Sequence, residues 1–229
     1  MAELSPMMQQ YLEIKNQHKD EILFYRIGDF YEMFFDDAVT ASRELDLTLT
    51  GKQCGLAERA PMCGVPFHSY EGYVARLIAK GYKVAICEQV EDPAKAKGLV
   101  KRDIIRVVTP GTVIESSMLQ DDRNNYIASL YLKGKKAGLC FADVSTGTAH
   151  ITELTADKIA PAVITELCRY HPSEVLLNPG LLDCREVTAY IKKNMSCSVE
   201  LVEDERYAPG LVASARGGGS WSRLAADHR

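Results

Sequence analysis

Phe30 and Glu32 are the two side chains whose types and spacing point most directly to a chemical task. They stand two positions apart, directly after a Gly-Asp dipeptide at 28–29, and the apolar run 22–27 (ILFYRI) precedes that dipeptide. Two strand-like runs joined by a two-residue step that begins with glycine predict a β-hairpin. Because successive strand side chains alternate between faces, we expect Phe30 and Glu32 on one face, with Phe34 behind them.

An aromatic ring beside a carboxylate on an exposed face suits the recognition of a disrupted base pair. Phe30 can wedge into a base stack, and the unstacking cost is lowest where a pair is already mismatched or missing. Glu32 can accept a hydrogen bond from the displaced base or, if it is protonated, donate one to a purine nitrogen. Taken alone, each residue also has a plainer interpretation, as a core aromatic and as a solvated strand acid. The interleaved residues Tyr31, Met33 and Phe35 are expected on the opposite face, in the core.

The composition is that of an ordinary globular protein, with 46% hydrophobic residues, 25% charged residues and a net charge of −4. No run approaches the ~18 apolar residues that a membrane span needs. The polar N-terminal segment does not resemble a signal sequence, so we expect a cytoplasmic chain without a membrane partner. The seven cysteines are scattered and contain no C-x-x-C pair, which argues against a disulfide framework and against a metal site.

A basic segment before a predicted strand is the candidate for phosphate contacts. Between positions 95 and 106 Asp103 is the only acid, and the basic residues are Lys95, Lys97, Lys101, Arg102 and Arg106. Five phosphate contacts would make DNA binding steeply dependent on salt. The alternative is a solvated loop that leads into a strand.

Helices and strands alternate over the first ~110 residues, which predicts a compact α/β unit. Helices are expected from Ser5-Pro6, from Asp36 or Asp37 to about Leu45, and over 70–80 after a Ser69 cap. Strands are expected at 22–27, 30–35, 45–50, 83–90 and 104–109. The segment 51–61 is expected to be a loop, and Pro61–His68, with two prolines, a rigid loop in which His68 is structural.

A second unit is predicted after a polar linker at 111–122. Strands are expected at 125–132, 137–144, 148–154, 173–177 and 198–202, with helices over 160–170 and 184–193. Three hairpin strands followed by helix and strand are the opening of a ribonuclease-H-like layout. The glycine- and serine-rich residues 208–229 are expected to be a disordered or non-native tail.

The segment around Phe30 and Glu32 resembles the Phe-X-Glu motif of the bacterial MutS family of DNA mismatch-repair proteins. Three further segments resemble signatures of the same N-terminal module: SPMMQQYLEIK (5–15), APMCGVPFHSYEGYVARLIAKGYKVAICEQVEDP (60–93) and RVVTPGT (106–112). The resemblance is strong over residues 4–112 and looser over 123–207. It implies a mixed-sheet α/β mismatch-recognition domain at 1–110 and a truncated ribonuclease-H-like α/β connector domain at 123–207.

The resemblance also implies roles for particular residues. Phe30 would be the wedge at a mispair or small insertion/deletion loop, and Glu32 would bond the displaced base. Met62 and Cys63 would make backbone-level contacts in the minor groove. No catalytic residue and no metal ligand is expected.

The partners implied are mismatched double-stranded DNA, a second MutS subunit in the full-length protein, and MutL through the connector domain. ATP and magnesium would belong to an ATPase domain. No G-x-x-x-x-G-K-[ST] loop occurs in this chain, so we expect a DNA-binding module without a cofactor, cytoplasmic and associated with the nucleoid.

Two alternatives remain at this point. One alternative to mismatch recognition is a metal-dependent nuclease of the ribonuclease H type, and the other is a protein-interaction module that only binds MutL. A nuclease would use Asp143 with further carboxylates, for which Glu166 and Glu174 are the candidates. Magnesium-dependent cleavage of a plasmid or an RNA–DNA hybrid would distinguish the two.

Overall fold

The computed structural model describes residues 4–91, 98–119 and 122–207, which divide into two compact units. The first unit contains the described residues up to Ile127 together with the turn Asp143–Thr148, and the second unit contains the rest. None of the described helices is long and apolar enough to cross a membrane.

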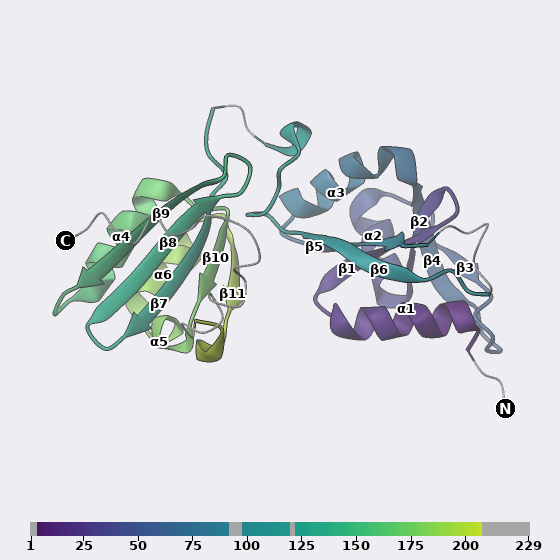
Figure 1. Ribbon diagram of the computed structural model, residues 1–229, viewed down its shortest axis with the longest axis horizontal. Coiled ribbons are helices and arrows are strands. Elements are labelled where there is room, and N and C mark those ends of the chain that lie inside the picture. The colour runs from purple at the N-terminus through teal and green to yellow at the C-terminus, as the bar shows by residue number, and fades with distance from the viewer. Residues whose placement is uncertain (1–3, 92–97, 120–121, 208–229) are drawn as a thin grey trace. The chain divides into compact units, whose positions relative to one another are not determined.

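The first unit is built on a six-stranded sheet in the order β3-β4-β2-β1-β5-β6 (Figure 1). Its strands are β1 (Glu21–Ile27), β2 (Phe30–Phe34), β3 (Thr50–Lys52), β4 (Ala60–Pro66), β5 (Lys83–Gln89) and β6 (Arg102–Val108). Strands β1 and β5 are parallel and the other neighbours are antiparallel, so the sheet is mixed. Its helices are α1 (Pro6–Gln17), α2 (Phe35–Leu45) and α3 (Tyr70–Ala79).

The two faces of this sheet carry separate hydrophobic clusters, because strand side chains alternate. Tyr31 and Met33 of β2 pack in the cluster that α2 and α3 cover. Phe34 packs in the other cluster, against Tyr11 of α1, with 5.0 Å between the ring centroids. The alternation therefore assigns Phe30 and Glu32 to the α1 side of the sheet, the same side as Phe34.

The predicted hairpin of β1 and β2 is confirmed. Residues 28 and 29 form the two-residue turn, and Ile27 pairs with Phe30. Gly28 has a φ of +56°, the conformation that favours glycine at the first central position of such a turn.

Phe35 differs from its prediction. It does not continue the strand on the core side of Tyr31 and Met33 but begins α2, with a φ of +53°. Its ring lies 6.2 Å from that of Tyr11, in the cluster on the α1 side. The left-handed backbone turns the chain from strand to helix within one residue, a conformation that is unusual for a residue other than glycine.

The segment at 60–66 is a strand rather than the predicted rigid loop. Its prolines, Pro61 and Pro66, stand at the second and last positions of β4, so the residues between them pair freely with β2. The predicted strand at 45–50 is also wrong, because Leu45 ends α2 and β3 begins only at Thr50.

The predicted helix starts are only partly right. Helices α1 and α3 begin where expected, but neither Ser5 nor Ser69 caps its helix through its side chain. Asp36 and Asp37 lie inside the first turn of α2 and do not cap it.

The Asp37 side chain instead links three elements: α1, β1 and the start of α2. Its buried carboxylate accepts hydrogen bonds from the backbone N–H of Leu23 (3.0 Å) and from the Tyr11 hydroxyl (3.3 Å). Lys15 of α1 forms an ion pair with its other oxygen at 2.9 Å. Asp37 therefore ties α1 and β1 to the start of α2.

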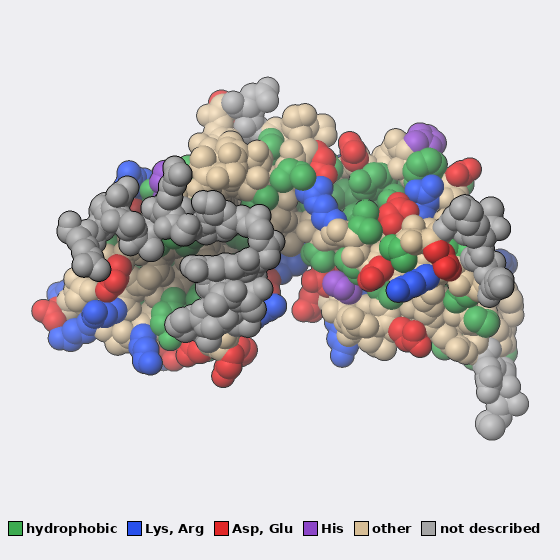
Figure 2. Space-filling view, in the orientation of Figure 1, with side chains coloured by type: hydrophobic (Ala, Val, Ile, Leu, Met, Phe, Trp, Pro, Cys, Tyr) green, Lys and Arg blue, Asp and Glu red, His purple; other side chains and the backbone are tan. Residues whose placement is uncertain are grey.

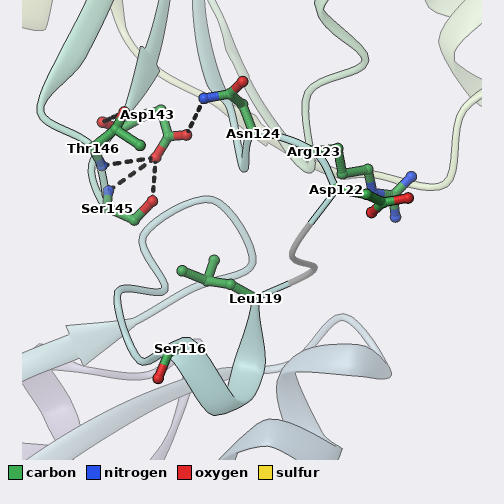
Figure 3. Close-up of a pocket in the computed structure, with 8 residues that line it drawn as sticks. All are labelled: Ser116, Leu119, Asp122, Arg123, Asn124, Asp143, Ser145 and Thr146. Atoms are coloured by element: carbon green, nitrogen blue, oxygen red, sulfur yellow. Dashed lines mark hydrogen bonds between the residues drawn. The ribbon is translucent and has the colours of Figure 1, made fainter.

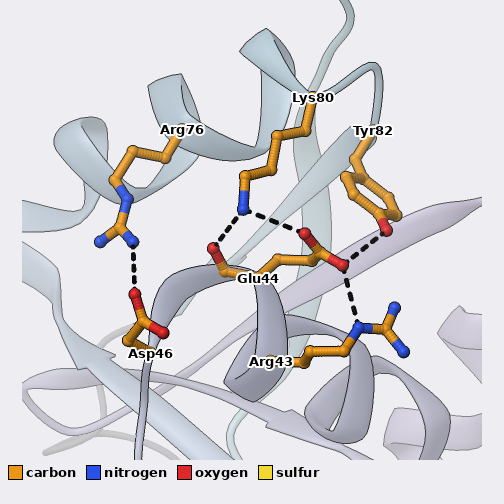
Figure 4. A network of polar contacts seen from close by, with 6 residues as sticks. All are labelled: Arg43, Glu44, Asp46, Arg76, Lys80 and Tyr82. Carbon is orange, nitrogen blue, oxygen red and sulfur yellow. Dashed lines mark hydrogen bonds and ion pairs between the residues drawn. The ribbon is translucent and has the colours of Figure 1, made fainter.

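A surface network connects the end of α2 to α3 and to the turn that follows α3 (Figure 4). Glu44 receives hydrogen bonds from Lys80, Arg43 and Tyr82, and the bond from Lys80 contributes most to holding the pKa of Glu44 below its ordinary value. Asp46, just after α2, pairs with Arg76 of α3 at 3.4 Å. The two helices over this face are thus linked at their ends.

The second unit has a five-stranded sheet in the order β11-β10-β7-β8-β9 (Figure 1). Its strands are β7 (Ile127–Lys133), β8 (Lys136–Asp143), β9 (Thr148–Thr155), β10 (Glu174–Leu177) and β11 (Ser198–Leu201), and its helices are α4 (Ile159–Tyr170), α5 (Pro179–Leu182) and α6 (Arg185–Asn194). Strands β10 and β11 are parallel and extend the sheet on the far side of β7. This order agrees with the ribonuclease-H-like layout, and the short helix α5 and the 3-10 helix η3 (Asp204–Tyr207) were not predicted.

Candidate nucleic-acid interface

Phe30 is the one large hydrophobic side chain of β2 that is exposed to solvent. Its side chain is 47% exposed, whereas Tyr31, Met33 and Phe34 are each at most 3% exposed. It pairs with Ile27 on one side and Pro66 on the other, so its backbone is held within the sheet. An exposed ring on a fixed backbone is available for stacking without rearrangement of the core.

Glu32 lies two residues along on the same face and is paired. Its Oε2 accepts a hydrogen bond from Nζ of Lys52 on β3, and the two side chains are 15% and 30% exposed, respectively. The same ammonium lies 5.7 Å from the centroid of the Phe34 ring. Sequence reasoning missed Lys52 because it treated residues 51–61 as a loop.

On the opposite face of the sheet, side-chain contacts stabilise the hairpin just before its turn. Arg26 pairs with Tyr31 across β1 and β2, and both donate to Oε1 of Glu88 on β5. The Arg26 guanidinium also lies 3.7 Å from the centroid of the Phe67 ring. Burial and the Glu88 carboxylate raise the pKa of the Tyr31 hydroxyl, so this group remains a donor at neutral pH. The residue pair next to Phe30 is therefore fixed from beneath.

Of the two predicted contacts from β4, Met62 is half-buried on the α1 side and Cys63 is in the core. The Cys63 thiol is 1% exposed and donates to the carbonyl of Ala38 at 3.5 Å. Burial, together with the nearby Asp37, raises the pKa of this thiol to about 11. The thiol is thus neutral and inaccessible, and any contact of Cys63 with DNA would have to come from its backbone, as predicted.

Two of the five basic residues in the predicted segment, Arg102 and Arg106, make contacts within the fold. Arg102 is 9% exposed, and it donates to the carbonyl of Arg26 at 2.7 Å and to Oε1 of Gln10 at 3.1 Å. Arg106 forms an ion pair with Glu115 and donates to the carbonyl of Thr112. Both arginines are therefore engaged within the fold, Arg102 as a buried side chain and Arg106 as a partly exposed one.

Of the three predicted lysines, Lys101 is exposed, and Lys95 and Lys97 lie outside the described residues. The surface that the structure does assemble consists of Phe30, Glu32, Lys52, Met62 and Gly64, which we call the hairpin face. It combines a half-exposed ring with a paired carboxylate on one side of the sheet.

Both carboxylate oxygens of Asp143, the candidate nuclease residue, accept hydrogen bonds from neighbouring residues (Figure 3). One oxygen accepts from Ser145 N–H and Oγ and from Thr146 N–H, and the other accepts from Asn124 and the N–H of Asn125. It borders an open pocket of about 380 Å³.

The other two candidate carboxylates belong to the second unit. Glu174 is buried, and Glu166 lies 3.8 Å from Arg169. Among the described residues no group of three or more His, Cys, Asp or Glu is placed to hold a metal ion. The structure therefore gives the nuclease hypothesis no support.

The bonded Asp143 predicts a particular dependence of stability on pH. Burial acts to raise the pKa of this carboxyl, but the hydrogen bonds from Ser145, Asn124 and Thr146 outweigh it and lower the pKa. The resulting stability is present above the unfolded pKa of about 3.9 and is lost as pH falls through the lower folded value.

We therefore expect Asp143→Asn to destabilise the protein at pH 7 and to cost progressively less below about pH 4. Urea denaturation at several pH values measures this difference. Asp157→Asn, at an 87% exposed side chain paired only with Lys135, is the control and should cost little at any pH. A cost of Asp143→Asn that is unchanged down to pH 2 would contradict the assignment.

Comparison with known families identifies both units. The family model for MutS domain I matches residues 5–117, and the model for MutS domain II matches residues 125–207. The chain belongs to the MutS family. The mixed-sheet first unit and the five-stranded second unit fit these two domains.

Curated relatives agree with this assignment. The chain is 53% identical to the DNA mismatch repair protein MutS of Ruminiclostridium cellulolyticum over 92% of its length, and 54% identical to that of Acetivibrio thermocellus over 90%. It is 52% identical to the MutS protein of Clostridium tetani over 89% of its length. The matched region is 24%, 24% and 23% of these relatives, so the chain spans about a quarter of their length.

Proposed function

We propose that this chain recognises mismatched double-stranded DNA through the hairpin face. Phe30 is the wedge that enters the base stack, and Glu32 is the hydrogen-bond partner of the displaced base. The observation that carries the proposal is the half-exposed Phe30 ring on a fixed strand, beside a paired carboxylate. Membership of a mismatch-repair family supports it.

The physical basis of selectivity is the cost of opening the stack. Insertion of a wedge requires unstacking free energy on any duplex, and this free energy is smallest where a base pair is already disrupted. Because the core fixes the backbone of Phe30, little conformational freedom remains to be lost on binding. Selectivity of this kind depends on the weakness of the pair and not on the base sequence.

Affinity is expected to be low and dependent on salt. The net charge is −4, and Arg102 and Arg106 are engaged within the fold. Of the five basic residues in the segment, three lysines remain for phosphates. Three contacts correspond to a slope of about −2.7 for the logarithm of affinity against the logarithm of salt concentration.

Fluorescence anisotropy with a G·T duplex, a single-base-insertion duplex and the matched homoduplex tests this proposal. We expect weak binding to all three, preference for the two disrupted duplexes, and loss of affinity between two salt concentrations in line with that slope. Equal affinity for all three duplexes, or tight binding that ignores salt, would overturn it.

For a longer protein of the relatives' length, family membership alone supports the remaining proposals. This region would act as a binding module without enzymatic activity of its own. It would work with a second MutS subunit, with MutL through the connector domain, and with ATP and magnesium bound in an ATPase domain. Its place would be the cytoplasm, at the nucleoid.

A further inference from the structure

We propose that Lys52 is the positioning residue of the mismatch-reading pair. Its ammonium neutralises Glu32 and fixes that carboxylate beside Phe30, so that an acid can face DNA without general repulsion. This inference rests on the proposed function, and it adds the residue that makes the carboxylate usable.

The ion pair spans the middle strand of three. Glu32 is on β2 and Lys52 on β3, with β4 between them. The β4 residue opposite Glu32 is Gly64, where a Cβ would lie 3.6 Å from Cγ of Glu32 and 3.1 Å from the carbonyl oxygen of Tyr31. Such a Cβ would be in ordinary contact with Glu32 but tight against the β2 backbone, so glycine at this position suits the close approach of β4 to β2 beside Glu32.

The ammonium of Lys52 is itself held in place. It lies over Phe34, which is fully buried and packs edge-on against Tyr11 of α1. The Glu32–Lys52 pair is also more shielded than an ordinary surface pair such as Lys135–Asp157, whose side chains are 72% and 87% exposed. Shielding lowers the local dielectric, so each charge affects the other more strongly than at an open surface.

The two oxygens of Glu32 are used differently. Oε2 accepts the hydrogen bond from Lys52, and within the described part of the chain Oε1 accepts none. Oε1 is thus available to a base that has lost its partner, while the pair as a whole carries no net charge. An unpaired carboxylate at the same place would repel phosphates on every duplex.

A direct phosphate contact by Lys52 is the competing explanation. The two explanations differ in whether the contribution of Lys52 to binding depends on the charge of Glu32. A lysine that binds phosphate on its own contributes equally whether or not Glu32 is charged. A lysine that acts through Glu32 loses its contribution once that charge is removed.

A double-mutant cycle of Lys52→Met and Glu32→Gln separates these explanations, with dissociation constants for the G·T duplex measured by anisotropy at low salt. We expect Lys52→Met to weaken binding about five-fold in the unmodified chain and less than about two-fold in the Glu32→Gln background. An equal loss in both backgrounds would overturn the inference. Lys101→Met, at an exposed lysine distant in sequence from the pair, is the matched control and should weaken binding equally in both backgrounds.

Lys52→Arg keeps the positive charge and should therefore retain the preference for the G·T duplex over the homoduplex. If Lys52 only supported the fold, restoring the charge would not by itself restore that preference. Thermal unfolding of every variant is recorded alongside, and Lys52→Gln replaces Lys52→Met in the cycle if the latter does not fold. Phe30→Ala distinguishes failure of the proposed function from failure of the role proposed for Lys52. If it leaves mismatch preference intact, the proposed function fails; if it removes the preference while the cycle shows no coupling, only the role of Lys52 fails.

Discussion

Asp37→Ala is expected to destabilise the first unit by about 3 kcal/mol, because it removes one partner of a buried ion pair. The Leu23 N–H and the Tyr11 hydroxyl would lose their acceptor inside the core, and Lys15 would keep an unpaired charge against it. The Lys15 side chain is 20% exposed, so water partly solvates its charge after Asp37 is removed. The expected loss of stability is therefore at the lower end of the range for removing one partner of a buried ion pair.

Urea denaturation followed through backbone amide signals of the first unit measures this loss separately from the second unit. Asp36→Ala is the matched control, because Asp36 is the preceding acid in the same helical turn and is exposed. It should change stability by less than about 0.5 kcal/mol. Similar losses for the two variants would show that Asp37 is not the tie between α1, β1 and α2.

Phe30→Ala is expected to abolish the preference for mismatched over matched duplex while leaving weak non-specific binding nearly intact. Stacking of an aromatic side chain on a base contributes about 1–3 kcal/mol, which is enough to account for the whole of a modest preference. Because the ring is 47% exposed, its removal should leave the fold intact. Anisotropy with the G·T duplex and the homoduplex measures the ratio of affinities.

Phe67→Ala provides the matched control for Phe30. Phe67 is 37% exposed and follows Pro66, the residue that pairs with Phe30, but its ring stacks on Arg26. Its removal should leave the mismatch preference in place, because strand pairing with Ile27 and Pro66 holds the backbone of Phe30 without this ring. If Phe30→Ala instead unfolds the first unit, the ring is a core residue and the wedge assignment is wrong.

Local pattern was sufficient to predict the hairpin and the exposed side of Phe30. The Gly28 turn fixes the register, and once the register is fixed the alternation of β2 follows. The strand at 83–89 and the helix at 70–79 were likewise recognisable, because each has a hydrophobic pattern of its own period.

The contacts of the site depend on residues far apart in sequence, and these were not predictable. Strand β3 has only three residues and is defined by pairing with β4, whose two prolines suggested a loop. Without β3 there was no reason to place Lys52 beside Glu32. Similarly, the basic run gave no sign that Arg102 binds Gln10, 92 residues away.

The most direct test of the central claim uses a fluorescent base analogue, 2-aminopurine, placed next to the mispair, because its emission reports whether it is stacked. At saturating protein and low salt, the unmodified chain is expected to change the emission of the mismatched duplex and to leave that of the matched duplex nearly unchanged. The Phe30→Ala variant, brought to the same degree of binding, should produce no change in either duplex. An identical change with Phe30→Ala would contradict the account, because the base stack would then open without the ring that is proposed to enter it.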